Sequence, residues 1–336
     1  MRRPWWGPPL DDDQRAVLDL VDDLTAERLH RAGDEQPDDV DRARETLAAQ
    51  GLWTLGVEAE RGGGGADLRT TLVALARLAG TWPALAWASV QAHAAAMVPS
   101  ARDGVDRIHG GAPVAVAPVD ADGPGDRLAA TLDRIDPAGR DPLVVLLSGD
   151  TALAVPPENV AFGPPVRRTG LDGALTVGCA VDVALTDDVV VRGPAVARAR
   201  SFLDVGAAAM AAGIAESAAQ AAHTYSDVRE QFGAPLTALP TVRASLSAQE
   251  TTVRGLLATS VAADIDRPAE AAAAVAPAFE AAIDVAAAAV QSHGGYGYMA
   301  EYGVEGLLRD AVSLRAAVDA TASLRVAADA LAGGGA

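Results

Sequence analysis

The chain of 336 residues has a single cysteine, Cys179, no lysine, and only 4% aromatic residues. One cysteine excludes an intrachain disulfide and any metal site built from several cysteines, and it suits a reducing cytoplasm. The five histidines have none of the short spacings found in zinc sites, so we predict no bound metal. We attribute the absence of lysine to a compositional bias of the genome rather than to function.

Basic residues are also few compared with acidic ones. The sequence has 27 arginines against 45 aspartates and glutamates, which gives a net charge of −18. Binding to nucleic acid requires clustered basic side chains facing the phosphates, so this balance excludes nucleic acid as a partner. We interpret the excess as a solvated acidic surface that aids solubility.

Neither the N-terminus nor one uncharged stretch has the pattern required of a signal peptide or of a membrane-spanning helix. The N-terminal residues MRRPWWGPPLDDD include no apolar core of a signal peptide. The uncharged stretch Leu78–Ser100 is interrupted by Pro83, Gln91 and His93, whereas a membrane-spanning helix needs about 20 predominantly apolar residues. We therefore predict that this stretch is a buried helix, and that the protein is cytoplasmic without membrane insertion.

The abundant residues indicate three segments that differ in composition and in the spacing of their apolar residues. Residues 1–109 and 198–336 are rich in alanine, and their apolar residues recur every three or four positions, which is typical of helices. Residues 110–197 instead contain short β-like runs separated by Gly, Pro and Asp. We predict a mainly α fold with a small β-domain (α+β): an N-terminal helical domain, a reduced middle β-domain and a C-terminal four-helix bundle. The expected strands are Pro113–Pro118, Leu143–Leu147, Leu153–Val155, Leu175–Val177 and Val181–Leu185.

Two motifs near the C-terminus carry the most specific information. They are YSDVREQFG at Tyr225–Gly233 and QSHGGYGYMAEYGVEGLLRDA at Gln291–Ala311. Together they resemble the C-terminal domain of acyl-CoA dehydrogenases, flavoproteins that oxidise acyl thioesters to enoyl thioesters. The order of the three segments resembles that family along nearly the whole chain.

The resemblance implies that FAD is the cofactor and that these motifs reach it across a subunit interface. An arginine offers a planar, bidentate fork to a diphosphate, and glycines let a cofactor approach the backbone closely. The implied cofactor-binding residues are Arg229, Gln231, Phe232, Gln291, Gly294 and Gly295. We expect His293 to be structural.

The same resemblance implies that the carboxylate base of the family is missing from its usual positions in this chain. Abstraction of the proton α to a thioester carbonyl needs a positioned carboxylate. The two places where the family has it fall here on Leu203 and Val318. An aspartate follows each of them, and Asp204 and Asp319 are therefore our candidate bases, with no preference between them. We expect Glu301 and Glu305 to be dispensable for the chemistry.

The β-domain also departs from the family. Ala117-Pro118-Val119-Asp120 stands where the family has a Thr/Ser-Glu-Pro turn, and we find no counterpart of its Lys-Trp-Ile-Thr hairpin, which flanks the flavin. Two functions stay open. The chain is a FAD-dependent dehydrogenase of an acyl-CoA or other acyl thioester that passes electrons to an electron-transfer flavoprotein, working within a heteromer. Alternatively, it is a non-catalytic subunit that completes the flavin site of a homologous, glutamate-bearing subunit.

Overall fold

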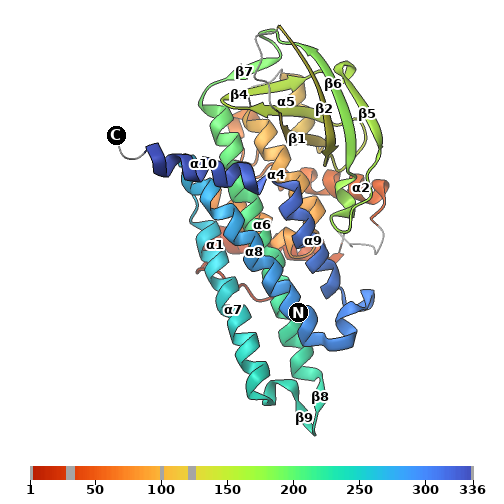
Figure 1. The fold of residues 1–336 in the computed structure, drawn as a ribbon, viewed down its shortest axis with the longest axis vertical. Helices are drawn as coiled ribbons and strands as arrows, with labels where there is room; N and C mark the ends of the chain where they lie inside the picture. Colours follow the sequence, from red (N-terminus) through yellow and green to blue (C-terminus); the bar gives the residue numbers. More distant parts are fainter. Residues whose placement is uncertain (1–2, 28–34, 99–101, 120–125, 334–336) are drawn as a thin grey trace.

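The computed structural model describes residues 3–27, 35–98, 102–119 and 126–333. A β-domain lies at one end of a long helical body, as Figure 1 shows. The predicted fold class, mainly helical with small β-sheets, is confirmed. The helices before the sheets are α1 (Asp12–Glu27), α2 (Pro37–Ala49), α3 (Leu68–Ala79), α4 (Pro83–Met97) and α5 (Arg102–His109); those after them are α6 (Pro194–Val228), α7 (Pro240–Val261), α8 (Pro268–His293), α9 (Val304–Ala317) and α10 (Ala320–Gly333).

Helix α6 is the axis of the molecule. It packs against α3 and α4 on one side and against α7, α8 and α9 on the other. Its small residues allow this, because a Cβ at Gly213 would lie 1.8 Å from the carbonyl oxygen of Ala76 on α3. Helices α6 to α9 form the predicted four-helix bundle, with α10 lying across one end (Figure 1).

Two segments, Pro194–Val228 and Pro268–Tyr298, are long and apolar enough to cross a membrane by length and composition. Both run through the bundle, and the most apolar window is 89% buried inside the protein in the first segment and 44% buried in the second. Helix packing thus accounts for the apolarity of Pro194–Val228.

The prediction of one buried helix over Leu78–Ser100 was wrong in its extent, and Ser100 lies outside the described residues. The chain forms two helices here, because α3 ends at Ala79 and α4 begins at Pro83. Proline fits the first turn of a helix, where its missing N–H is not needed. Every residue of α4 from Pro83 to Ala96 is buried, as predicted.

The β-domain consists of two small sheets that enclose their own apolar core. One sheet has the order β1 (Val114–Pro118), β3 (Leu143–Ser148), β4 (Thr151–Val155), β7 (Val190–Arg192), with β1 and β3 parallel. The other has the order β2 (Arg127–Ile135), β6 (Val177–Ala184), β5 (Val160–Pro165), all antiparallel.

The strands β1, β3 and β4 were predicted from the sequence. The two strands predicted at Leu175–Val177 and Val181–Leu185 are instead a single strand, β6. Leu175 is not in a strand; it has a left-handed backbone with φ of 49°. The strands β2, β5 and β7 were not predicted. Their residues are largely half-buried or exposed, and β5 contains Gly and Pro, so the apolar signal of a strand is weak there.

Candidate functional site

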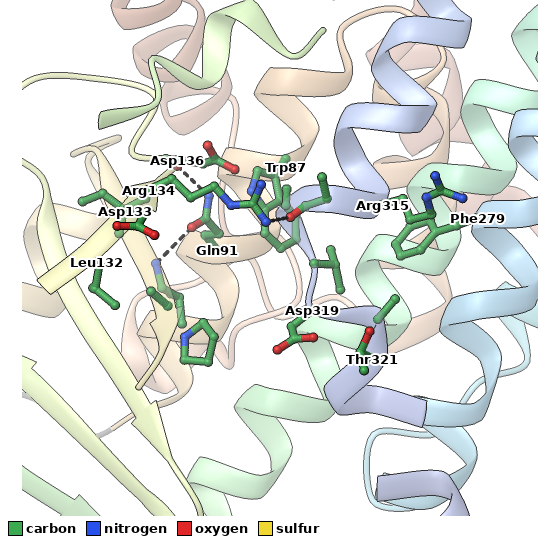
Figure 2. Close-up of a pocket in the computed structure, with 18 of the residues that line it drawn as sticks. Trp87, Gln91, Leu132, Asp133, Arg134, Asp136, Phe279, Arg315, Asp319 and Thr321 are labelled. Carbon is green, nitrogen blue, oxygen red and sulfur yellow. Dashed lines mark hydrogen bonds between the residues drawn. The ribbon is translucent and has the colours of Figure 1, made fainter. Parts of the chain in front are cut away.

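A cavity of about 670 Å³ lies where the β-domain meets the helical body. Figure 2 shows Asp133, Arg134 and Asp136 of the β-domain on one side and Phe279 and Arg315 of the bundle on the other. The ends of β1 and β2, helices α4 and α8, and the junction between α9 and α10 supply the lining. Segments far apart in the sequence therefore build one cavity.

Hydrogen bonds fix the β-domain wall of this cavity. The amide of Gln91 on α4 donates from Nε2 to the carbonyl of Asp136 at 2.8 Å and accepts at Oε1 from the N–H of Val116 at 3.0 Å. The Asp136 carboxylate in turn accepts from Arg168 at 2.8 Å and from the Thr176 hydroxyl at 2.5 Å. One buried glutamine thus ties α4 to the middle of β1 and to the end of β2 (Figure 2).

Arg134 crosses the cavity from the β-domain to the helices. It lies at the end of β2, and its guanidinium donates to the carbonyl of Ala316 in the last turn of α9. In Figure 2 its side chain reaches across from the β-domain toward the helices. Cationic groups near a helix C-terminus are favourable, because the last carbonyls have no partner within the helix.

Sequence reasoning missed this wall of the site. We found no counterpart of the family's flavin-flanking hairpin, yet the structure places Leu132–Asp136 at the cavity. The segment reads LDRID, so it lacks the aromatic and hydroxyl residues that would have revealed it. Its position becomes visible only once β2 has paired with β6.

A smaller pocket of about 80 Å³ adjoins the cavity and shares part of its lining. Leu203 from α6 and Val318 from the end of α9 both line it, as do Asp204 and Asp319. The two positions where the family has its base therefore converge on one pocket, and both candidate aspartates lie there.

The two aspartates differ in their surroundings. Asp204 is only 8% exposed and accepts a hydrogen bond from the Ser323 hydroxyl of α10 at 2.8 Å. Burial raises the pKa of Asp204 to about 6, although the Ser323 hydrogen bond and the charge of Arg200 oppose the shift. Asp319 instead accepts from the backbone N–H of Ala322 at 3.0 Å, which makes it the N-terminal cap of α10.

The acids of the Gly-rich turn lie outside both of these pockets. Glu301 is exposed within a short 3₁₀ turn (Ala300–Tyr302). Glu305 is bound to Arg309, with 2.6 Å between Nε and Oε2. Neither residue lines the cavity or the smaller pocket.

The predicted cofactor-binding residues lie at the other end of the bundle. Arg229 follows α6 directly, and Gln231 belongs to a two-stranded hairpin of β8 (Glu230–Gln231) and β9 (Ala234–Pro235). Phe232 and Gly233 form the turn, both with positive φ (55° and 82°), and Phe232 is 92% exposed. A bulky apolar residue held in this strained conformation at a protruding tip is unusual for a surface that faces only water. Figure 1 shows the hairpin at the end of the molecule away from the β-domain.

The Gly-rich turn lies beside this hairpin. Arg229 stands over the ring of Tyr296, 5.7 Å from its centroid, and has no ion-pair partner among the residues that the structure describes. Gln291 is exposed, and a Cβ at Gly294 or Gly295 would meet nothing within 4 Å. His293 is buried, contacts the carbonyl of Ala289 through Nδ1 at 2.8 Å and stacks on Tyr225, which fits the structural role expected for it.

These residues form a donor set suited to a dinucleotide cofactor. They offer a guanidinium without a carboxylate partner, an exposed amide and an open glycine turn, and a diphosphate is recognised by such groups. FAD therefore fits the residues present. However, the donor set and the cavity lie at opposite ends of the bundle, so one chain does not bring them together (Figure 1). In the described part of the chain, no group of three or more His, Cys, Asp or Glu is arranged to hold a metal ion.

Comparisons with known proteins match both helical parts of the chain to one family. Residues 11–107 match the family described as acyl-CoA dehydrogenase, N-terminal domain, and residues 197–318 match acyl-CoA dehydrogenase, C-terminal domain. The chain is similar to the 3-(aryl)acrylate reductase of Clostridium sporogenes, with 31% identity over 170 residues, which cover 46% of this chain and 44% of that protein. The match thus spans less than half the length of this curated relative.

Solved structures share the fold. Butyryl-CoA dehydrogenase from Megasphaera elsdenii is 20% identical with a TM-score of 0.78, covering 96% of this chain and 99% of that one. Glutaryl-CoA dehydrogenase from Mycobacterium smegmatis, in complex with FADH2, is 16% identical with a TM-score of 0.82, covering 96% and 95%. At these identities the similarity establishes the fold alone.

Proposed function

We propose that this chain is a subunit of a FAD-dependent acyl-CoA dehydrogenase. The chain belongs to the acyl-CoA dehydrogenase family through both its N-terminal and its C-terminal domain. The reaction is the α,β-desaturation of an acyl thioester, with electrons passed to an electron-transfer flavoprotein. The enzyme is cytoplasmic and works as a heteromer with a homologous subunit.

One observation carries the proposal: the cofactor-binding donor set and the cavity are at opposite ends of the same chain. Arg229 and the Gly294–Gly295 turn are exposed and directed to the outside, while the cavity lies between the β-domain and the helices. Two chains packed end to end would bring the donors of one to the cavity of the other.

Each part of the chain then has a defined task. FAD, when bound, supplies the hydride acceptor. Arg229 holds the diphosphate of the neighbouring chain's cofactor, while Gln291 and the glycine turn contact it. In the cavity, Gln91 keeps the middle of β1 and the end of β2 in place. A carboxylate in the smaller pocket, Asp204 or Asp319, takes the α-proton of the thioester.

The alternative is a non-catalytic subunit that completes the flavin site of a glutamate-bearing relative. It is favoured by the apolar residues Leu203 and Val318 at the two positions of the family's base. In that case Leu203→Glu or Val318→Glu would not create full activity, because the charged segment Leu132–Asp136 would still line the cavity.

Purification of this chain alone and together with a glutamate-bearing relative tests the proposal. We expect native mass spectrometry to show a heteromer with fewer flavins than subunits, and acyl-CoA oxidation that requires both chains. A homo-oligomer with one flavin per subunit and full turnover would contradict the heteromer. A complex without flavin or turnover would contradict the enzymatic function.

A further inference from the structure

Six carboxylates are buried in the described part of the chain, and one of them is unlike the rest. Asp22 and Glu216 share Arg77, and Asp136 binds Arg168. Glu35 and Asp310 accept from backbone N–H groups, at Gly173 and Leu171 respectively. Asp204 accepts instead from a neutral side-chain hydroxyl, that of Ser323, and forms no ion pair.

Such a carboxylate costs stability, because a buried charge is expensive without a cation or several hydrogen bonds. Ionisable groups kept in unfavourable surroundings cluster at functional sites, where a perturbed proton affinity is useful. Asp204 also lines a pocket rather than close-packed core. Burial, location and the absence of an ion pair among the described residues therefore agree.

We propose that Asp204 is the carboxylate that removes the α-proton and that Ser323 is the residue that positions it. This assignment rests on the proposed function. In the step, the α C–H bond breaks, its electron pair passes into the thioester enolate, and the proton forms an O–H bond on Asp204. Ser323 donates to Oδ1 at 2.8 Å, which holds the carboxylate in one orientation and connects α10 to α6.

The competing candidate already has a structural task. The Oδ1 atom of Asp319 accepts from the Ala322 N–H at the start of α10, so it satisfies a backbone donor that no other helical residue can reach. The helix that Asp319 caps carries Ser323. Asp319 thus acts on the site by holding α10 in place.

The electrostatics of the pocket fit this division. Arg200, one turn before Asp204 on α6, and Asp319 are the charged residues that line the pocket beside it, and their charges oppose one another. The surrounding walls are apolar, from Trp87 on α4 to Val116–Pro118 on β1 and Val326 on α10. A base in such surroundings takes up a proton near neutral pH.

The test is exchange of the α-proton of an acyl-CoA into D2O, followed by mass spectrometry, under anaerobic conditions. This chain is assembled with a partner whose own base glutamate is replaced by glutamine, so that only the base of this chain is measured. Exchange needs only the base, so it is independent of hydride transfer and of the electron acceptor. We expect Asp204→Asn to slow exchange by about 10²- to 10⁴-fold, the usual contribution of a positioned base. The amide keeps the shape of the side chain and can still accept from Ser323, so folding is retained.

Three further variants make the assignment specific. Ser323→Ala should move the acidic limb of the pH profile of exchange to higher pH, because loss of a hydrogen bond to the charged form raises the pKa of the base. A merely structural serine would lower the rate without moving the profile. Asp319→Asn should retain measurable exchange. Glu301→Gln, which changes an exposed acid outside both pockets, serves as the matched control.

The outcomes separate this assignment from the proposed function. Exchange that survives Asp204→Asn, or that is abolished by Asp319→Asn alone, would overturn the assignment while dehydrogenation by the assembly could still stand. Exchange by the wild type without dehydrogenation would support Asp204 and contradict the dehydrogenase. If the wild type shows neither, both are wrong.

Discussion

Arg229→Ala is the change that most directly tests whether the hairpin end of the bundle binds a flavin. The guanidinium is exposed, has no ion-pair partner in the described residues, and its contact within the chain is the ring of Tyr296 at 5.7 Å. A charge-assisted hydrogen bond contributes about 1.5–3 kcal/mol. Its loss should raise the Kd for FAD by about 10- to 150-fold, since 1.4 kcal/mol corresponds to a factor of ten.

The folding free energy should change little, because surface substitutions away from special features usually stay within about 0.5 kcal/mol. FAD binding is measured on the purified assembly by flavin fluorescence, and thermal unfolding of the same samples reports stability. Arg229→Lys keeps the charge without the planar fork, so it should bind FAD with intermediate affinity.

Arg267→Ala is the matched control. Arg267 is an exposed arginine at the start of α8, the opposite end of that helix from the Gly turn, and it is paired with Glu270 at 2.8 Å. Its removal should leave FAD affinity as it was. An unchanged Kd in Arg229→Ala, or an equal loss in Arg267→Ala, would refute the placement of the cofactor at this end of the bundle.

The remaining predictions concern stability, measured by urea or thermal unfolding. Gly213→Ala should destabilise the folded protein by about 1–3 kcal/mol or more, since the added Cβ would meet the Ala76 carbonyl oxygen at 1.8 Å. Gly255 lies on the exposed face of α7 and a Cβ there would meet no atom within 4 Å, so Gly255→Ala should stabilise the folded protein by about 0.5–1 kcal/mol. Equal effects of the two substitutions would contradict the packing of α3 on α6. Asp319→Ala should cost about 0.5–2 kcal/mol through loss of the α10 cap, and no change would exclude that cap. The pKa of Asp204 is raised to about 6 in the folded protein, so the charged carboxylate lowers the stability of the fold fully above that pH. Asp204→Asn should therefore be more stable than the wild type at pH 7.5, by on the order of 3 kcal/mol at most. This difference in stability should disappear toward pH 4, where the carboxyl of the wild type is protonated in the folded protein. A pH-independent difference would show that burial does not perturb this carboxyl.

The sequence was sufficient where a contiguous string marks the family. YSDVREQFG and the Gly-rich turn identified the family and the residues that gather around Arg229, because each string forms a single helix end whose neighbours are local. The convergence of Leu203 and Val318 on one pocket was not predicted and is seen only in the structure.

The cavity wall could not be predicted in this way. The segment Leu132–Asp136 has no apolar alternation and no family residues, and it reaches the cavity only because β2 pairs with β6 and Gln91 ties its end to α4. Long-range pairing of this kind leaves little trace in local composition. The prediction of strands therefore failed for the half-exposed β2, β5 and β7 and succeeded for the buried β3.

What the sequence by itself determined is the helical character of both ends, the order of the segments and the strings that mark the family, because these depend on helix propensity and on neighbours within a few residues. The tertiary structure decided the rest. It left Asp204 buried beside Ser323 and turned Asp319 into a helix cap, although the sequence presents them as equal aspartates one residue beyond a missing base. The physical reason is that proton affinity is set by desolvation and by hydrogen-bond partners, and 119 residues separate Asp204 from the hydroxyl that binds it.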